Sequence, residues 1–258
     1  MVSRLRGEGG YTLTELLVVC AIFGMIAGAS LGLYRVAQQT YTTSYSLVEA
    51  QSEARAAIDR MVADLRLAGS FVKGATNAPA SVTSASSTAI TFLADIDGDT
   101  LASGAEATAS SASGTSVTVS SATGFSATAN EEYLYIGSGI TREVRLISSI
   151  SGTTLTLSAS LTGDFSSSNC ASSACIVRSV ESIAWTYSSG TLTRQVGSTT
   201  AETITSNISS FALTYYDSSN NTTTTAASIR RIKVNLTVGS GSTKRTMEVE
   251  VLPVSLGL

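Results

Sequence analysis

The sequence predicts an α+β protein, in which one long N-terminal helix packs on an antiparallel β-sheet head that carries a β-rich insertion. An apolar run over residues 11–34 continues into a segment of helical periodicity that ends near Gly69. After Pro79 the chain turns into short alternating segments separated by Gly, Ser, Asn and Asp, which is the pattern of strands and turns. Residues 103–170 are very rich in Ser, Thr, Gly and Ala, and the alternation of residues 143–147 predicts ordered strands there.

The composition excludes several classes of function. The chain has 258 residues and no histidine, so a Ser-His-Asp triad, a Cys-His pair and an imidazole metal site are excluded. A pI near 5.1 without a run of Lys or Arg argues against a nucleic-acid partner. No phosphate-loop or dinucleotide motif is present. We therefore expect no catalytic residues, no resident cofactor and no nucleic-acid binding.

The apolar run over residues 11–34 is long enough to cross a membrane. At 1.5 Å per residue it spans about 36 Å, against a bilayer core of about 30 Å. Arg4 and Arg6 precede it and predict a cytoplasmic N-terminus. A cleavable secretory signal would have a shorter apolar core and a small-residue cleavage site.

Glu15 is the one charged residue within this run. A carboxylate in lipid costs about 2.5–3.5 kcal/mol, so a plain membrane anchor does not explain it. Cleavage between Gly10 and Tyr11 would place a new α-amine four residues before Glu15, on the same helix face. The amine and the carboxylate would then neutralise each other, either within one chain or between neighbouring copies.

The segment from Arg4 to Val19 resembles a class III prepilin signal, which marks type IV pilins and type II secretion pseudopilins. The resemblance implies that a prepilin peptidase cuts after Gly10, removes residues 1–10 as a leader and N-methylates Tyr11. Phe is commoner at the position of Tyr11. It also implies that Glu15 docks the subunit against its neighbour in a growing filament.

The same resemblance implies partners and a location. The expected partners are other pilins or pseudopilins, the prepilin peptidase, assembly platform proteins and the bacterial inner membrane. The chain would be a single-pass inner-membrane protein before assembly, and then part of a periplasmic or cell-surface filament.

Glycines and a second amphipathic half complete the predicted helix. Gly24, Gly28 and Gly32 recur at every fourth position, which is a helix-packing stripe in membranes or simply the usual glycine content of a membrane span. Residues 35–69 follow as an amphipathic helix. The predicted buried stripe is Ala54, Ile58, Met61, Val62, Leu65 and Ala68, with Arg55, Asp59, Arg60, Asp64 and Arg66 at the other positions. Gly69 is the predicted C-terminal cap.

The stretch from Asp59 to Gly69 is similar to the D-L-R-x-A-G ending of PilW-type minor pilins, and next to that of GspJ-type minor pseudopilins. The resemblance implies a pilin-like β head formed by residues 70–102 and 171–258, interrupted by the insertion over residues 103–170. The expected strands are 89–94, 116–120, 133–136, 143–150, 153–157, 176–187, 191–196, 211–216, 229–238 and 244–252.

Two further groups carry possible chemistry. Asp95, Asp97 and Asp99 alternate around a turn, which is either a calcium site or an Asp-Gly turn that needs no metal. Cys170 and Cys175 would form a short-loop disulfide if the head lies in an oxidising compartment. Zinc is not expected, because no histidine or other nearby cysteine completes a ligand set.

A minor pilin that joins or initiates a type IV pilus-like filament is the leading functional hypothesis. A minor pseudopilin of a type II secretion system is the alternative within that class. An anchored adhesin or binding module, with the insertion as its contact surface, and a membrane-anchored enzyme are the alternatives outside it.

Overall fold

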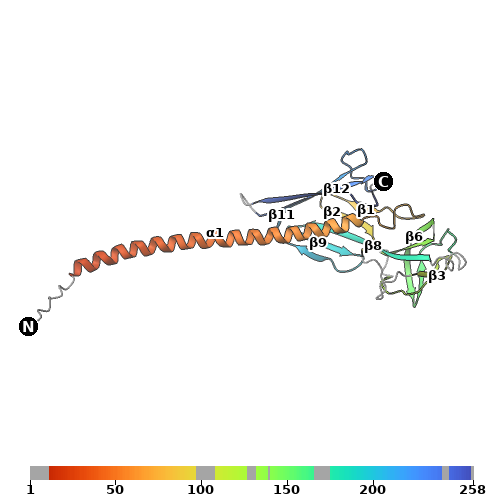
Figure 1. The fold of residues 1–258 in the computed structure, drawn as a ribbon, viewed down its shortest axis with the longest axis horizontal. Helices are drawn as coiled ribbons and strands as arrows, with labels where there is room; N and C mark the ends of the chain where they lie inside the picture. Colours follow the sequence, from red (N-terminus) through yellow and green to blue (C-terminus); the bar gives the residue numbers. More distant parts are fainter. Residues whose placement is uncertain are drawn as a thin grey trace, which may run out of the picture. The chain divides into compact units, whose positions relative to one another are not determined.

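The computed structural model describes residues 12–96, 108–126, 132–138, 140–165, 175–239 and 244–256. Helix α1 comprises Leu13–Leu67. The strands are β1 Val82–Ala85, β2 Ala89–Ala94, β3 Thr108–Ser113, β4 Ser116–Val119, β5 Glu132–Ser138, β6 Thr141–Ser151, β7 Thr154–Leu157, β8 Cys175–Ser188, β9 Thr191–Val196, β10 Glu202–Thr205, β11 Ile208–Tyr216, β12 Arg231–Val238 and β13 Arg245–Val251 (Figure 1). The predicted α+β class, with one long helix and antiparallel sheets, is confirmed.

The chain divides into two units, residues 1–49 and 50–258. Within the first unit the described residues belong almost entirely to α1, and their large apolar side chains are exposed. By length and composition, α1 is long and apolar enough to cross a membrane, and the mean hydropathy of its most apolar stretch is 2.4. The second unit contains the C-terminal part of α1 and all the strands.

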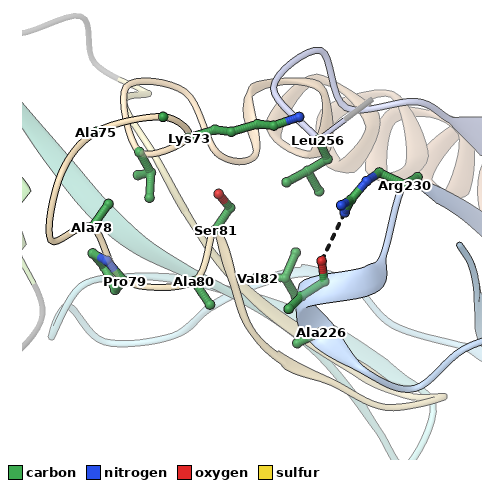
Figure 2. Close-up of a pocket in the computed structure, with 13 residues that line it drawn as sticks. Lys73, Ala75, Ala78, Pro79, Ala80, Ser81, Val82, Ala226, Arg230 and Leu256 are labelled. Carbon is green, nitrogen blue, oxygen red and sulfur yellow. Dashed lines mark hydrogen bonds between the residues drawn. The ribbon is translucent and has the colours of Figure 1, made fainter. Parts of the chain in front are cut away.

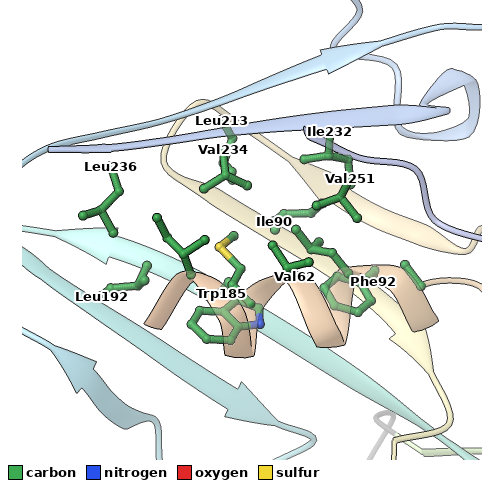
Figure 3. Packing of buried hydrophobic residues seen from close by; sticks show 14 of the residues in the cluster. Val62, Ile90, Phe92, Trp185, Leu192, Leu213, Ile232, Val234, Leu236 and Val251 are labelled. Atoms are coloured by element: carbon green, nitrogen blue, oxygen red, sulfur yellow. The ribbon is translucent and has the colours of Figure 1, made fainter. Parts of the chain in front are cut away.

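The C-terminal part of α1 packs on two sheets of the second unit. β2, β8 and β9 belong to one antiparallel sheet, and β11, β12 and β13 form another in that order. Figure 3 shows Val62 of α1 among side chains of both sheets, including Phe92 and Leu213. We call this cluster the head core. It also contains Ala54, Ala57, Ile58, Met61, Leu65, Ala68, Ile90, Trp185, Leu192, Ile232, Val234, Leu236 and Val251. The predicted buried stripe of the helix is therefore confirmed.

The strands from β3 to the first half of β8 pair in a closed ring and form a barrel. β3 pairs with β4, β4 with β7, β7 with β6, and β6 with β5. The N-terminal half of β8 closes the ring, because it pairs with β5 on one edge and with β3 on the other. This six-stranded barrel, β3 to β7 plus the first half of β8, lies partly in the segment expected as an insertion and is completed by a strand that begins at Cys175.

The barrel has an apolar interior of its own, which we call the barrel core. It consists of Ala109, Ala112, Val117, Val119, Leu134, Ile136, Ile147, Leu155, Leu157, Phe165, Cys175 and Val177. None of these residues comes from α1. Hydroxyl side chains such as Ser116 and Thr156 alternate with the apolar ones along β4 and β7. One face of each strand is therefore buried in the barrel, and the other face is polar and contacts water.

Strand β8 joins the two parts of the second unit. Its N-terminal half pairs with β5 through Glu132–Glu181 to Gly137–Ile176, and its C-terminal half pairs with β2 and β9. A second connection is the segment after α1. Thr76 N–H donates to the Arg142 carbonyl at 2.8 Å, and the Val144 N–H donates to the Thr76 carbonyl at 3.3 Å. The barrel is thus tied to the head by β8 and by the segment after α1.

Candidate functional site

The start of α1 forms a capping box around Glu15. Thr12 is the N-cap residue, and its N–H and Oγ1 donate to Glu15 Oε2 at 2.9 and 3.0 Å. The Glu15 N–H lies 3.4 Å from Thr12 Oγ1, which closes the reciprocal arrangement. Thr-x-x-Glu is the spacing of a capping box, in which both residues satisfy helix N-terminal N–H groups. Glu15 therefore stabilises the helix start as well as carrying its charge.

Only one oxygen of the Glu15 carboxylate is used in this cap. Both bonds from Thr12 reach Oε2, and no described residue donates to Oε1. The neighbouring Leu16 and Leu17 are about 60 % exposed, so the carboxylate stands on an apolar helix surface. A carboxylate oxygen with spare lone pairs in such surroundings is suited to accept an amine from another chain.

The predicted glycine stripe lies on an open helix face. A Cβ atom at Gly24, Gly28 or Gly32 would meet nothing within 4 Å among the described residues. The stripe thus leaves room for the close approach of a second helix. Its packing role stays a prediction.

Several predicted site residues lie outside the described part of the chain. Gly10 and Tyr11, the predicted cleavage and methylation residues, are among them, as are Asp97, Asp99 and Cys170. The predicted disulfide and the predicted calcium site therefore stay predictions.

One residue of the predicted disulfide, Cys175, and one of the predicted calcium site, Asp95, lie within the described ranges. Cys175 is buried at the start of β8. Asp95 is buried directly after β2, and its N–H donates to Ser70 Oγ at 2.9 Å. No group of three or more Asp, Glu or Cys side chains suited to a metal occurs within the described ranges.

The end of α1 corrects one expectation. The helix periodicity predicts that Asp64 lies outside the buried stripe, but the structure buries its side chain. Its Oδ2 lies 2.6 Å from Arg194 Nε in an ion pair and accepts a hydrogen bond from Trp185 Nε1 at 3.0 Å. The partner arginine comes 130 residues later in the chain, so the spacing on the helix alone could not reveal the pair.

Gly69 closes the helix as predicted. Its φ is +81°, a left-handed conformation that glycine adopts without strain, and its N–H donates to the Leu93 carbonyl at 2.7 Å. A Cβ atom at this position would lie 2.9 Å from Ser81 Oγ. The end of the D-L-R-x-A-G stretch is therefore fixed by packing against the strands.

Two buried carboxylates, Glu132 and Glu181, lie at the junction between barrel and head, and no sequence pattern predicted them. Ser179 Oγ lies 2.7 Å from Glu132 Oε1 and 2.5 Å from Glu181 Oε1. Glu132 accepts from the Ser126 N–H and Glu181 from the Ile96 N–H. These residues come from three separate segments, and only the folded barrel brings them together.

Comparison with known families supports the N-terminal site. Residues 5–31 match the prokaryotic N-terminal methylation motif. Neither the curated proteins nor the solved structures gave a match to the chain. The matched segment contains the predicted cleavage site, Glu15 and two of the three stripe glycines. In its N-terminal signal and its long apolar helix, the chain is type IV pilin-like.

Proposed function

We propose that this chain is a minor pilin, a structural subunit that joins or initiates a type IV pilus-like filament. The carrying observation is the methylation motif over residues 5–31 together with a helix that presents one carboxylate on an exposed apolar surface. The role is structural, and it requires assembly surfaces instead of an active site. Membrane anchoring before assembly follows from the same helix.

Processing prepares the helix start for assembly. A prepilin peptidase cuts after Gly10, and the new N-terminus at Tyr11 is methylated and stays positively charged. It then directly precedes Thr12, the N-cap of α1. The charge that an intramembrane Glu15 carries is costly without a partner. The N-terminal amine of a neighbouring subunit, received at Oε1, neutralises it.

The capping box permits a sharp test of this mechanism. Gln can replace Glu in a capping box, so Glu15→Gln keeps the helix cap and removes only the charge. Thr12→Ala does the opposite, because it removes the cap and keeps the charge. We expect Glu15→Gln to abolish incorporation into filaments isolated from cells, and Thr12→Ala to reduce it only slightly. Normal incorporation of Glu15→Gln would contradict the proposal.

Mass spectrometry of the mature N-terminus tests the processing step independently. The expected product begins at Tyr11 and carries one added methyl group. A Gly10→Val variant should remain at full length and stay out of filaments. An unprocessed Met1 in the filament-associated protein would overturn the proposed route.

The proteins that the chain assembles with distinguish a type IV pilus from a type II secretion system. We propose a pilus, and a PilW-type subunit in particular, on the D-L-R-x-A-G stretch at the end of α1. Crosslinking of the full chain in cells, followed by identification of the captured pilins, checks this. Capture of secretion pseudopilins alone would assign the chain to a type II secretion system instead.

The barrel favours a second role as a binding module. Its core contains no residue of α1, so the barrel contributes nothing to the burial of the helix stripe. A domain whose core is separate from the packing of the helix is available for contact with a surface or ligand. Ile140, on the β5–β6 connection, is 99 % exposed. Ile140→Asp should reduce attachment of cells without reducing filament number if the barrel is adhesive.

A further inference from the structure

A pocket of about 280 Å³ lies between the segment that follows α1 and the C-terminal end of the chain. Its walls come from residues 72–82, from the turn around Ala226 and Ala227, and from Arg230 and Leu256 (Figure 2). Three of the lining side chains of the first wall are those of alanines, Ala75, Ala78 and Ala80, and such short side chains leave the pocket open. Gly74 lines it too, and a Cβ atom there would meet nothing within 4 Å.

The charge in this pocket is entirely positive. Lys73 and Arg230 line it, and no Asp or Glu does. Figure 2 shows the ammonium of Lys73 and the guanidinium of Arg230 on the side of the pocket where Leu256 lies. Within the described residues, neither cation has a carboxylate within 4 Å. By contrast, Arg194, Arg231 and Lys233 are each paired with an acid.

Arg230 is held in place with part of its donor set unused. Its Nη1 donates to the carbonyls of Ala227 at 3.0 Å and Ile229 at 2.8 Å. No residue in the described ranges accepts from Nε or Nη2. The guanidinium plane is therefore fixed before any ligand arrives, and a planar fork of this kind suits a carboxylate.

The floor of the pocket is apolar. Ala75, Ala78, Pro79 and Ala226 line it and keep part of their surface exposed, above the buried side chains of Val72, Val82 and Leu256. A ligand that placed only a charge between Lys73 and Arg230 would leave this floor in contact with water. A short aliphatic group beside the charge would cover the floor and gain from its burial.

We propose that this pocket binds a carboxylate that carries a short aliphatic group. The carboxylate lies between Lys73 and Arg230, and the aliphatic group covers the partly exposed alanines and Pro79 of the floor. Two sources have this chemistry, a free short-chain acid and the C-terminal carboxylate of a peptide that ends in an aliphatic residue. The site is independent of filament assembly through Glu15.

Ligand-observed NMR titration of the full chain in detergent micelles tests the proposal. The probes are butanoate, its uncharged amide butyramide, inorganic phosphate and N-acetyl-leucine as a peptide-like carboxylate. We expect butanoate to bind. Butyramide should bind at least about tenfold more weakly because it lacks the charge, and phosphate at least about tenfold more weakly because it has no aliphatic group to bury on the floor. Tighter binding of N-acetyl-leucine than of butanoate assigns the peptide source, and the reverse order assigns the free acid.

Two variants locate the binding. Lys73→Gln should weaken butanoate binding about threefold, and Arg230→Gln about tenfold, because the fork contributes paired donors. Lys244→Gln, at an exposed lysine outside the pocket, is the matched control and should change nothing. Arg230 also braces its own turn, so a thermal melt accompanies that variant. Lys73 has no described side-chain partner, and unchanged binding in Lys73→Gln overturns the proposal, as does phosphate binding equal to that of butanoate.

Discussion

The head core and the barrel core differ in how they relate to α1. The head core contains six residues of α1, from Ala54 to Leu65, and its largest side chains include Trp185, Phe92 and Met61. The barrel core contains no helix residue and is built mainly from Val, Leu, Ile and Ala. Helix α1 therefore packs in the head core and not in the barrel core, although β8 runs through both.

Substitutions in the two cores should therefore have different effects. A change in the head core should loosen the attachment of α1 and so affect filament entry. A change in the barrel core should disturb the barrel and leave the helix attached.

The ion pair between Asp64 and Arg194 should give the largest effect. Asp64→Ala leaves the Arg194 guanidinium buried without its acid, which costs about 3–5 kcal/mol of unfolding free energy for a buried pair. Denaturant unfolding measures this, and Trp185, the one tryptophan, reports it directly because its Nε1 donates to Asp64. Asp59→Ala, at an exposed acid of the same helix, is the control and should change stability by less than about 0.5 kcal/mol.

Removal of both partners sharpens that result. Asp64→Leu combined with Arg194→Leu replaces the pair by apolar groups, and we expect it to recover much of the lost stability. If the double variant were as unstable as Asp64→Ala, then loss of the Trp185 hydrogen bond or poor packing, and not the unpaired arginine, would be the cause.

Truncation of one leucine in each core tests the comparison itself. Leu65→Ala in the head core and Leu134→Ala in the barrel core each remove a fully buried side chain, at a cost of about 2–5 kcal/mol. Hydrogen exchange read by mass spectrometry should show lost protection in α1 and β11–β13 for Leu65→Ala. It should show loss in β4–β7 for Leu134→Ala. Equal loss in both regions for both variants would mean that β8 makes the two cores one cooperative unit.

Two glycines after α1 separate steric clash from backbone strain. Gly69 and Gly74 both have a left-handed backbone, with φ values of +81° and +79°. Only at Gly69 would a Cβ atom clash, at 2.9 Å from Ser81 Oγ. We expect Gly74→Ala to cost about 1 kcal/mol and Gly69→Ala about 2–3 kcal/mol, measured as the shift of the urea midpoint. Similar costs would show that Ser81 moves away freely.

Much of the helix could be predicted from the sequence, because its information is local. The apolar run and the three- and four-residue spacing predicted one continuous helix from residue 11 to the cap at Gly69, and the structure has Leu13–Leu67. The cap partner of Glu15 could also have been found, since Thr12 stands three residues before it. The burial of Asp64 could not, because its partner Arg194 is distant in the chain.

The strands show the same limit. All ten expected strands are present, but β1, β3 and β10 were not expected, because Ser, Thr, Ala and Glu in short segments give a weak strand signal. Closure of the barrel depends on β4 pairing with β7 and β3 with β8, which are separated by many residues. Uniform Ser and Thr faces do not specify such partners, so the pairing is decided by which apolar faces can be buried together.

The smallest effect is expected on the outer face of β12, where a surface ion pair contrasts with the buried pair of Asp64. Lys233 Nζ lies 2.6 Å from Glu248 Oε1, and the hydrogen bond to Glu248 raises the pKa of the lysine above its ordinary value of 10.5. A raised pKa in the folded state means that the pair stabilises the protein fully below about pH 10.5 and that this contribution is lost as the pH rises through the folded-state pKa. Lys233→Gln should therefore lower the melting temperature slightly at pH 8, and the difference from the unchanged protein should shrink as the pH rises above 10.5 and through the raised folded-state pKa of the lysine. The pair is solvent-exposed and screened by salt, so 0.5 M NaCl should shrink the difference at pH 8 as well. A difference that persisted at high pH and high salt would show that the lysine acts through packing of its aliphatic stem, and not through its charge.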